Sequence, residues 1–220
     1  MNAQRLRPMA LAGAALALAT AASAASLQVT VLARDGQPLA DAVVSVEMPG
    51  MALPATPAPV TVTIDQQAMR FVPALTVVPV GSRIRFSNLD SWEHHVRAIP
   101  PDTGNSAAPG EARRGFELRL PGRAAHQAAP HAEGVVDSPG PWRLGCHLHG
   151  SMRGHVWVST TPWVGKTDRA GVAQIPDLPE GNAVLRVWHP EQVVETTPQA
   201  LTLSGSATTR LATAIQPRRR

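Results

Sequence analysis

Prolines and glycines interrupt this chain along most of its length, and they restrict what it can fold into more than any other feature. There are 21 prolines and 17 glycines among its 220 residues. Proline breaks a helix interior and glycine weakens it, so a helix bundle needs long stretches that are free of both. Beyond residue 25 no segment combines such a stretch with a sustained helical period. A helical bundle is therefore excluded.

Short segments that alternate apolar and polar residues fill the space between these breakers, as expected for half-buried strands. Asp35-Gly36 is a typical hairpin turn and predicts that the first two strands pair. Residues 100–141 contain one short strand candidate and otherwise predict a long irregular loop. The chain is predicted to be all-β, with one or two sandwiches. The expected strands are 27–31, 41–47, a segment from 61, 74–80, 83–86, 94–99, 115–120, 142–146, 154–160, 183–188, 201–203 and 208–211.

The first 24 residues have the pattern of a secretory signal peptide. Arg5 and Arg7 precede an apolar run over residues 9–20, and Ala22-Ser23-Ala24 matches a small-residue cleavage site. The run is shorter than a membrane-spanning helix, and no later segment is long and apolar enough. We therefore expect export to the periplasm, cleavage near Ala24 and no membrane span in the mature chain.

Charge and motifs exclude several function classes. The formal net charge is only +4, and the one dense group of arginines is the basic tail at residues 215–220. That distribution does not match a nucleic-acid-binding surface. The chain lacks the Gly-x-Ser-x-Gly and His-Glu-x-x-His motifs and a phosphate-binding glycine loop. We therefore expect a protein that is not an enzyme and does not bind nucleic acid.

The only cysteine, Cys146, lies within seven residues of His149 and Met152. Alone, each of these residues has an ordinary structural role: the cysteine is a small buried side chain, the histidine is a polar surface group, and the methionine packs in the core. Together, a thiolate, an imidazole and a thioether form the ligand set that selects copper. A blue-copper centre needs a second histidine, which on the residues alone is either His94 or His95.

The same residues resemble the copper-binding motifs of cupredoxins. Cys146-x-x-His149-x-x-Met152 resembles the ligand loop of amicyanin. Asn88, followed by His94 and Val96, resembles the segment that carries the first histidine ligand in amicyanins and plastocyanins. Together with Gly145 before the cysteine, the chain resembles bacterial "methylamine utilization" cupredoxin-like proteins.

This resemblance implies a Greek-key β-sandwich holding one mononuclear type 1 copper ion. The implied ligands are His94, Cys146, His149 and Met152. His95 stands where amicyanin-like proteins have asparagine, and strand alternation points its side chain to the opposite face, as for His147 beside Cys146. A register shift of one residue would exchange His94 and His95.

A second resemblance concerns the two ends of the chain. Residues 27–49 resemble the first hairpin of a carboxypeptidase regulatory-like domain, a small transthyretin-like sandwich, and residues 167–187 resemble its second half. This implies a cupredoxin domain inserted into a split sandwich, whereas the alternative is two unrelated hairpins on one sandwich. The expected layout is a signal peptide at 1–24, half-domains at 25–59 and 161–214, a cupredoxin domain at 60–160 and a basic tail at 215–220.

The resemblance implies a periplasmic electron carrier with transient redox protein partners. A rim containing Leu148, Gly150 and Trp92 would surround His149. The first alternative is copper storage, delivery or sensing, which the additional histidines would favour. The second is a structural envelope protein. The additional histidines are His95, His126, His131 and His147.

The sequence also predicts that His155 faces solvent and that Trp188-His189-Pro190 is structural.

Overall fold

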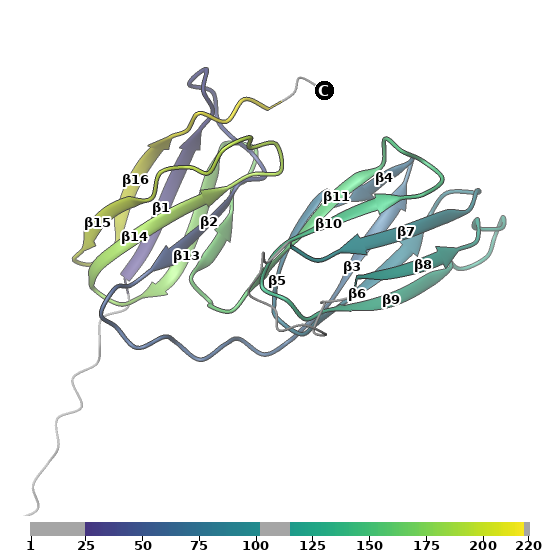
Figure 1. Cartoon of the computed structure of the whole chain (residues 1–220), viewed down its shortest axis with the longest axis horizontal. Helices are drawn as coiled ribbons and strands as arrows, with labels where there is room; N and C mark the ends of the chain where they lie inside the picture. The colour runs from purple at the N-terminus through teal and green to yellow at the C-terminus, as the bar shows by residue number, and fades with distance from the viewer. Residues whose placement is uncertain (1–24, 102–114, 218–220) are drawn as a thin grey trace, which may run out of the picture.

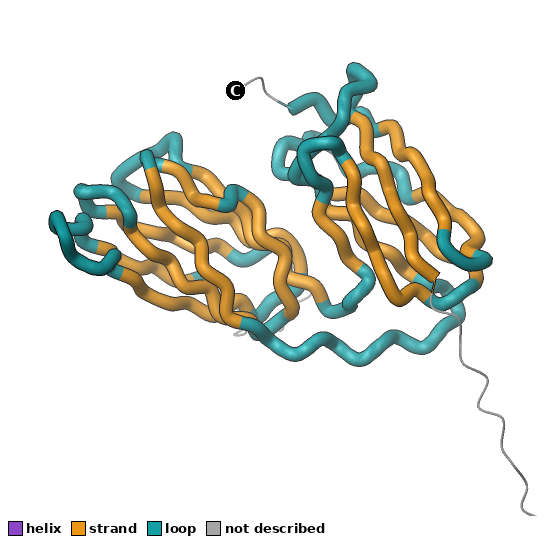
Figure 2. Tube along the Cα trace, turned by 180° about the vertical axis from the view of Figure 1, so that it is seen from behind, coloured by secondary structure: helices purple, strands orange, loops and turns teal. Residues whose placement is uncertain are grey.

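The computed structural model describes residues 25–101 and 115–217, so the predicted signal peptide and the last three arginines lie outside the described residues. Over these two ranges the regular elements are sixteen β-strands and no helix (Figure 2). The all-β prediction is confirmed. The described residues form no helix that is long and apolar enough to cross a membrane.

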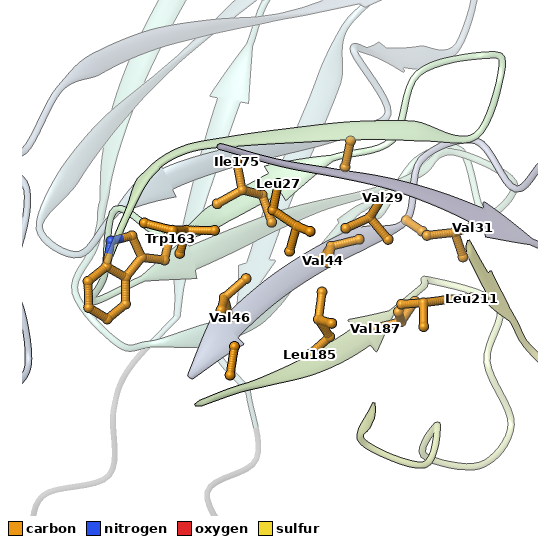
Figure 3. Close-up of a cluster of buried hydrophobic side chains, with 14 of the residues drawn as sticks. Leu27, Val29, Val31, Val44, Val46, Trp163, Ile175, Leu185, Val187 and Leu211 are labelled. Atoms are coloured by element: carbon orange, nitrogen blue, oxygen red, sulfur yellow. The ribbon is translucent and has the colours of Figure 1, made fainter. Parts of the chain in front are cut away.

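Strands from both ends of the described chain form one sandwich, which we call the terminal sandwich (Figure 1). β1 lies between its antiparallel partner β13 and its parallel partner β16, and the second sheet has the order β12-β2-β14-β15. Both sheets contribute aliphatic side chains to one core (Figure 3). The strands are β1 (Ala25–Leu32), β13 (Val172–Leu178), β16 (Ala207–Ala212), β12 (Val164–Lys166), β2 (Val43–Glu47), β14 (Gly181–Trp188) and β15 (Gln199–Leu203).

The middle of the chain forms a second sandwich, the central sandwich. Its five-stranded sheet has the order β5-β11-β10-β7-β8, and its four-stranded sheet has the order β4-β3-β6-β9. Trp142, Phe71 and Phe86 are the largest side chains fully buried in its core. The strands are β5 (Leu75–Pro79), β11 (Arg153–Ser159), β10 (Gly140–Cys146), β7 (His94–Ile99), β8 (Phe116–Leu120), β4 (Arg70–Val72), β3 (Thr61–Gln67), β6 (Ser82–Asn88) and β9 (His131–Val136).

The predicted pairing of the first two strands is wrong. Residues 33–37 do turn, with Gly36 at a positive φ of 79°, but only the isolated bridge between Leu32 and Pro38 follows the turn. Both edges of β1 are already occupied, by β13 and β16. The chain therefore crosses to the opposite sheet, where β2 buries its own apolar face.

The predicted loop at residues 100–141 is also partly wrong, because His131–Val136 forms strand β9 beside β6. Three further strands, β4, β12 and β13, were not expected. β4 and β12 have three residues each, too few for a periodic pattern. β13 contains Pro176, which an edge strand tolerates because one of its sides makes no ladder hydrogen bonds.

The strands of the terminal sandwich come from two segments, and the central sandwich lies between them in sequence. The proline-rich residues 48–60 run as an extended connection from one sandwich to the other (Figure 1). The rings of Trp157 and Trp188 lie 5.2 Å apart across the two sandwiches, and Lys166 Nζ donates to the Leu75 carbonyl at 3.0 Å. Insertion of one independently folding domain into another stays a prediction.

Candidate metal centre

Cys146 is the last residue of β10, and the neighbouring strand β7 fixes its position. Cys146 is opposite Val96 in the antiparallel ladder, and its side chain is 8% exposed. The backbone N–H of His95 donates to Sγ at 3.4 Å. That hydrogen bond ties the sulfur to the start of β7.

Two imidazoles face this sulfur. His94 Nδ1 lies 3.7 Å from Sγ, and His149 Nδ1 lies 3.5 Å from it. The two rings meet nearly edge to face, with their centroids 4.9 Å apart. One ligand atom from each of the three residues lies within 4.8 Å of the others, so the structure brings together three of the four predicted site residues.

Asp90 holds the first of these imidazoles in place. Its Oδ2 lies 2.9 Å from His94 Nε2, and its carboxylate also accepts the backbone N–H groups of Ala68 and Met69. Burial alone raises the pKa of Asp90, but the hydrogen bonds from His94, Met69 and Ala68 outweigh it and hold the pKa below its usual value. A charged Asp90 accepts a hydrogen bond from the Nε2–H group of His94, and this tautomer leaves the Nδ1 lone pair directed at the sulfur.

Asn88 fixes the loop that leads to His94. Its Nδ2 donates to the carbonyls of Trp92 and Pro121, each at 2.8 Å, while its Oδ1 accepts the Asp90 backbone N–H at 2.9 Å. The side chain is fully buried. Asn88 belongs to the family pattern seen in the sequence. Asp90 had no predicted role, although a carboxylate four residues before a candidate ligand is a visible signal.

Met152 lies in the short turn between β10 and β11. It is 1% exposed, belongs to the same buried cluster as Cys146, and donates its backbone N–H to the His149 carbonyl at 2.9 Å. That bond closes the turn around His149. The role of Met152 as a fourth ligand stays a prediction, as do the ligand roles of the other three residues.

Two of the additional histidines lie together on the outer face, as alternation predicts. His95 and His147 flank Glu117, with Nε2-to-carboxylate distances of 3.5 and 3.2 Å. The hydrogen bond from His147 lowers the pKa of Glu117. His126 and His131 are both exposed, His126 in a turn and His131 at the start of β9.

The expectation for His155 is wrong. It does not face solvent: its ring lies 5.6 Å from that of Trp188 in the terminal sandwich, and burial lowers its pKa to about 4. The side chains of β11 alternate as predicted, but the face that carries His155 and Trp157 packs against Trp188 of the terminal sandwich. His189 is 6% exposed.

The arrangement suits a soft, imidazole-binding metal ion. A thiol and two imidazoles meet at the end of a close-packed sandwich. The hydrogen bond that His94 makes to Asp90 orients one imidazole, and the hydrogen bond from the His95 backbone N–H holds the sulfur. Copper prefers such thiolate and imidazole ligands. His149 is the half-buried member, and its neighbours Leu148 and Gly150 are exposed, as is Trp92.

Comparison with known proteins gives matches among solved structures alone: no family model and no curated protein matches the chain. A reduced amicyanin mutant is similar over 52% of this chain and 99% of its own, with 19% identity and a TM-score of 0.33. Auracyanin A, a "blue" copper protein from Chloroflexus aurantiacus, is similar over 46% and 100%, with 18% identity and a TM-score of 0.33. A copper-containing nitrite reductase from Thermus scotoductus is similar over 52% of this chain and 25% of its own, with 22% identity and a TM-score of 0.34. Amicyanin and auracyanin A are cupredoxins, and each of the three structures is similar to only about half of this chain.

Proposed function

We propose that the central sandwich holds one type 1 copper ion and that the protein carries single electrons between transient redox protein partners in the periplasm. The proposed ligands are His94, Cys146, His149 and Met152. The observation that carries the proposal is the convergence of two imidazole Nδ1 atoms on one cysteine sulfur, at 3.7 and 3.5 Å. His94 and Cys146 are 52 residues apart in sequence, so the fold itself brings them together.

Bound copper would supply a one-electron redox couple, and the chain would supply a rigid set of ligands for both oxidation states. Asp90 keeps the His94 ring fixed through Nε2, and the His95 backbone N–H keeps a hydrogen bond to Sγ. Ligands fixed in this way do not rearrange when the charge at the site changes, which favours fast electron exchange. We infer a carrier rather than an enzyme.

His149 is the proposed contact point for partners, because it is the ligand that is only half buried. Leu148 beside it is 55% exposed, and Trp92 is 44% exposed. Exposed apolar side chains next to a redox site suit small, short-lived contacts between proteins.

A second candidate function is copper storage or delivery by the same ligands. The outward-facing His95 and His147, with Glu117 between them, favour it because they place more metal-binding side chains beside the first set. Reversible voltammetry of the copper-loaded protein separates the two functions. A carrier gives a reversible one-electron wave, whereas a storage protein releases or rearranges its ion when reduced.

Addition of Cu(II) to the purified protein tests the copper site. We expect one equivalent to produce an intense visible thiolate-to-copper band, and Cys146→Ser to abolish it, because a serine oxygen is a poor substitute for a soft thiolate. Ser151→Ala, in the same turn, is the matched control and keeps the band. A coloured Cys146→Ser protein would refute the assignment.

A second comparison tests the register of β7. His94→Ala should weaken copper binding much more than His95→Ala or His147→Ala, since only His94 faces the sulfur. Equal losses for His94→Ala and His95→Ala, measured by competition with a copper chelator, would show that the two histidines are exchanged.

A further inference from the structure

Three side chains converge on the outer face of the five-stranded sheet, and we call them the outer cluster: His95, Glu117 and His147. One ligand atom from each lies within 4.8 Å of the other two. Glu117 lies between the imidazoles, 3.5 Å from His95 Nε2 and 3.2 Å from His147 Nε2, and the ring centroids are 4.7 Å apart. The site proposed above uses none of these side chains.

Strand alternation places this cluster directly behind the buried one. His94 and Cys146 point into the sandwich, so the next residue after each points outward. The two outward histidines are held in register, because the backbone N–H of His147 donates to the His95 carbonyl at 3.0 Å. Glu117 belongs to the next strand, β8, where it is paired with Arg97 of β7. The sheet therefore positions all three groups.

We propose that the outer cluster is a second metal site, which binds one divalent transition-metal ion of the kind that imidazole prefers, such as Zn²⁺ or Cu²⁺. Two imidazoles and one carboxylate are common ligands for these ions. Ligand atoms about 2.0–2.1 Å from a tetrahedral ion lie about 3.3 Å from one another. Glu117 Oε2 lies 3.5 Å from His95 Nε2 and its Oε1 lies 3.2 Å from His147 Nε2, so each imidazole has a carboxylate oxygen at about that distance.

The exposure of the cluster fits a site that exchanges its ion with solution. The side chains of His95, His147 and Glu117 are 17%, 42% and 51% exposed. Three protein ligands at such a surface leave a coordination position for water. This site lies outside the buried ligand set and does not depend on copper being bound there.

Arg97 competes for the same carboxylate, and it defines the alternative explanation. Its Nε lies 3.6 Å from Glu117 Oε1, and its side chain is 52% exposed. An exposed ion pair of this kind contributes little to stability, so a bound cation displaces the guanidinium at small cost. If Glu117 served only this ion pair, the cluster would bind no metal.

Calorimetric titration of the full-length protein with Zn²⁺ alone tests the proposal. We expect Glu117→Gln and His147→Gln each to weaken zinc binding at this site by roughly tenfold or more, since losing a ligand costs at least as much as losing an outer-shell partner. At a zinc concentration that only just fills the wild-type site, the wild type then binds one equivalent more than either variant. Glu133→Gln is the matched control, because Glu133 is also a strand glutamate paired with arginines, Arg85 and Arg83, and it lies on the four-stranded sheet. All three positions are at the surface, where such changes leave folding intact.

The outcomes separate this proposal from the copper assignment. If the buried site does not bind zinc, the wild type takes up one equivalent, and Glu117→Gln removes it. Zinc binding that is the same in wild type, Glu117→Gln and His147→Gln overturns the outer site. The visible copper band reports the buried site alone, so we expect it to be present in Glu117→Gln and absent in Cys146→Ser.

Discussion

The two sandwiches are built from the same kind of strand, but they differ in what they bury. The core of the terminal sandwich is almost entirely aliphatic, with Thr167 and His189 as its buried polar side chains among the described residues. The central sandwich buries more polar groups, and Gln66 has a side-chain amide without a hydrogen-bond partner in the described part of the chain. The buried polar residues of the central sandwich are Gln66, Ser82, Asn88, Asp90, His94, Ser138 and Ser159.

This difference indicates a division of roles. Burying a polar side chain costs free energy unless hydrogen bonds replace its contacts with water. In the central sandwich that cost is concentrated where Asn88, Asp90 and His94 meet, at the end of β6 and the start of β7. Among the described residues, the candidate ligand groups all belong to the central sandwich. We infer that it stabilises the chain, while the central sandwich gives up some stability for a site.

The largest expected effects come from opening a cavity in one core and following both sandwiches. Leu27→Ala in β1 and Ile84→Ala in β6 each remove a fully buried side chain and should cost about 2–5 kcal/mol. Leu27→Ala should unfold the terminal sandwich at a lower urea concentration and leave the copper band in place. Ile84→Ala should unfold the central sandwich, and with it the copper band, at a lower urea concentration and leave the unfolding of the terminal sandwich unchanged. Tryptophan fluorescence and the visible band follow the transitions. If either variant shifts both transitions together, the chain is one cooperative unit and the inserted-domain interpretation is wrong.

Thr167 tests the stabilising role of the terminal sandwich. Its buried hydroxyl donates to the Leu39 carbonyl at 2.7 Å and accepts the Ala42 N–H at 2.8 Å, which ties together segments 125 residues apart. Thr167→Val keeps the shape but leaves that N–H unpaired, so we expect a loss of about 1–3 kcal/mol in the free energy of unfolding. Urea unfolding measures it. Copper affinity should not change, and a weaker affinity would mean that the two sandwiches are coupled.

In the central sandwich, Asp90 is the buried residue that links separate segments by hydrogen bonds, as Thr167 does in the terminal sandwich. We expect its substitution to change copper affinity. Asp90→Asn keeps the size of the side chain but removes the charge that orients His94, so copper affinity should fall about 10–100-fold. Chelator competition measures it, with Thr167→Val as the comparison variant. An unchanged affinity would mean that β7 alone orients the imidazole.

How far the sequence could predict this molecule depended on how far apart the interacting residues lie. Cys146, His149 and Met152 share one short loop, so their relation was visible as a motif. Most strand positions followed from alternation, which is local, although β4, β9, β12 and β13 were missed. The pairing of β1 was not local, because β13 and β16 set it from more than a hundred residues away. Glu117 was missed for the same reason, since only β-sheet pairing brings it beside His95 and His147.

The smallest expected effect is a pH dependence from His155, where the sandwiches meet. Burial, with nearby His189 and Arg143, lowers its pKa to about 4, whereas an exposed histidine has a pKa of 6.5. The unfolded chain therefore takes up this proton at a higher pH than the folded chain. The stability that His155 contributes is complete above pH 6.5 and decreases as the pH falls towards 4. Each unit of pKa difference corresponds to about 1.4 kcal/mol, and partial exposure reduces the total to on the order of 1–2 kcal/mol.

Urea unfolding at pH 7 and pH 5 should show a smaller pH effect in His155→Gln than in the wild type, while His131→Gln, at an exposed strand position, should match the wild type. An equal pH effect in all three proteins would place the acid sensitivity elsewhere in the chain.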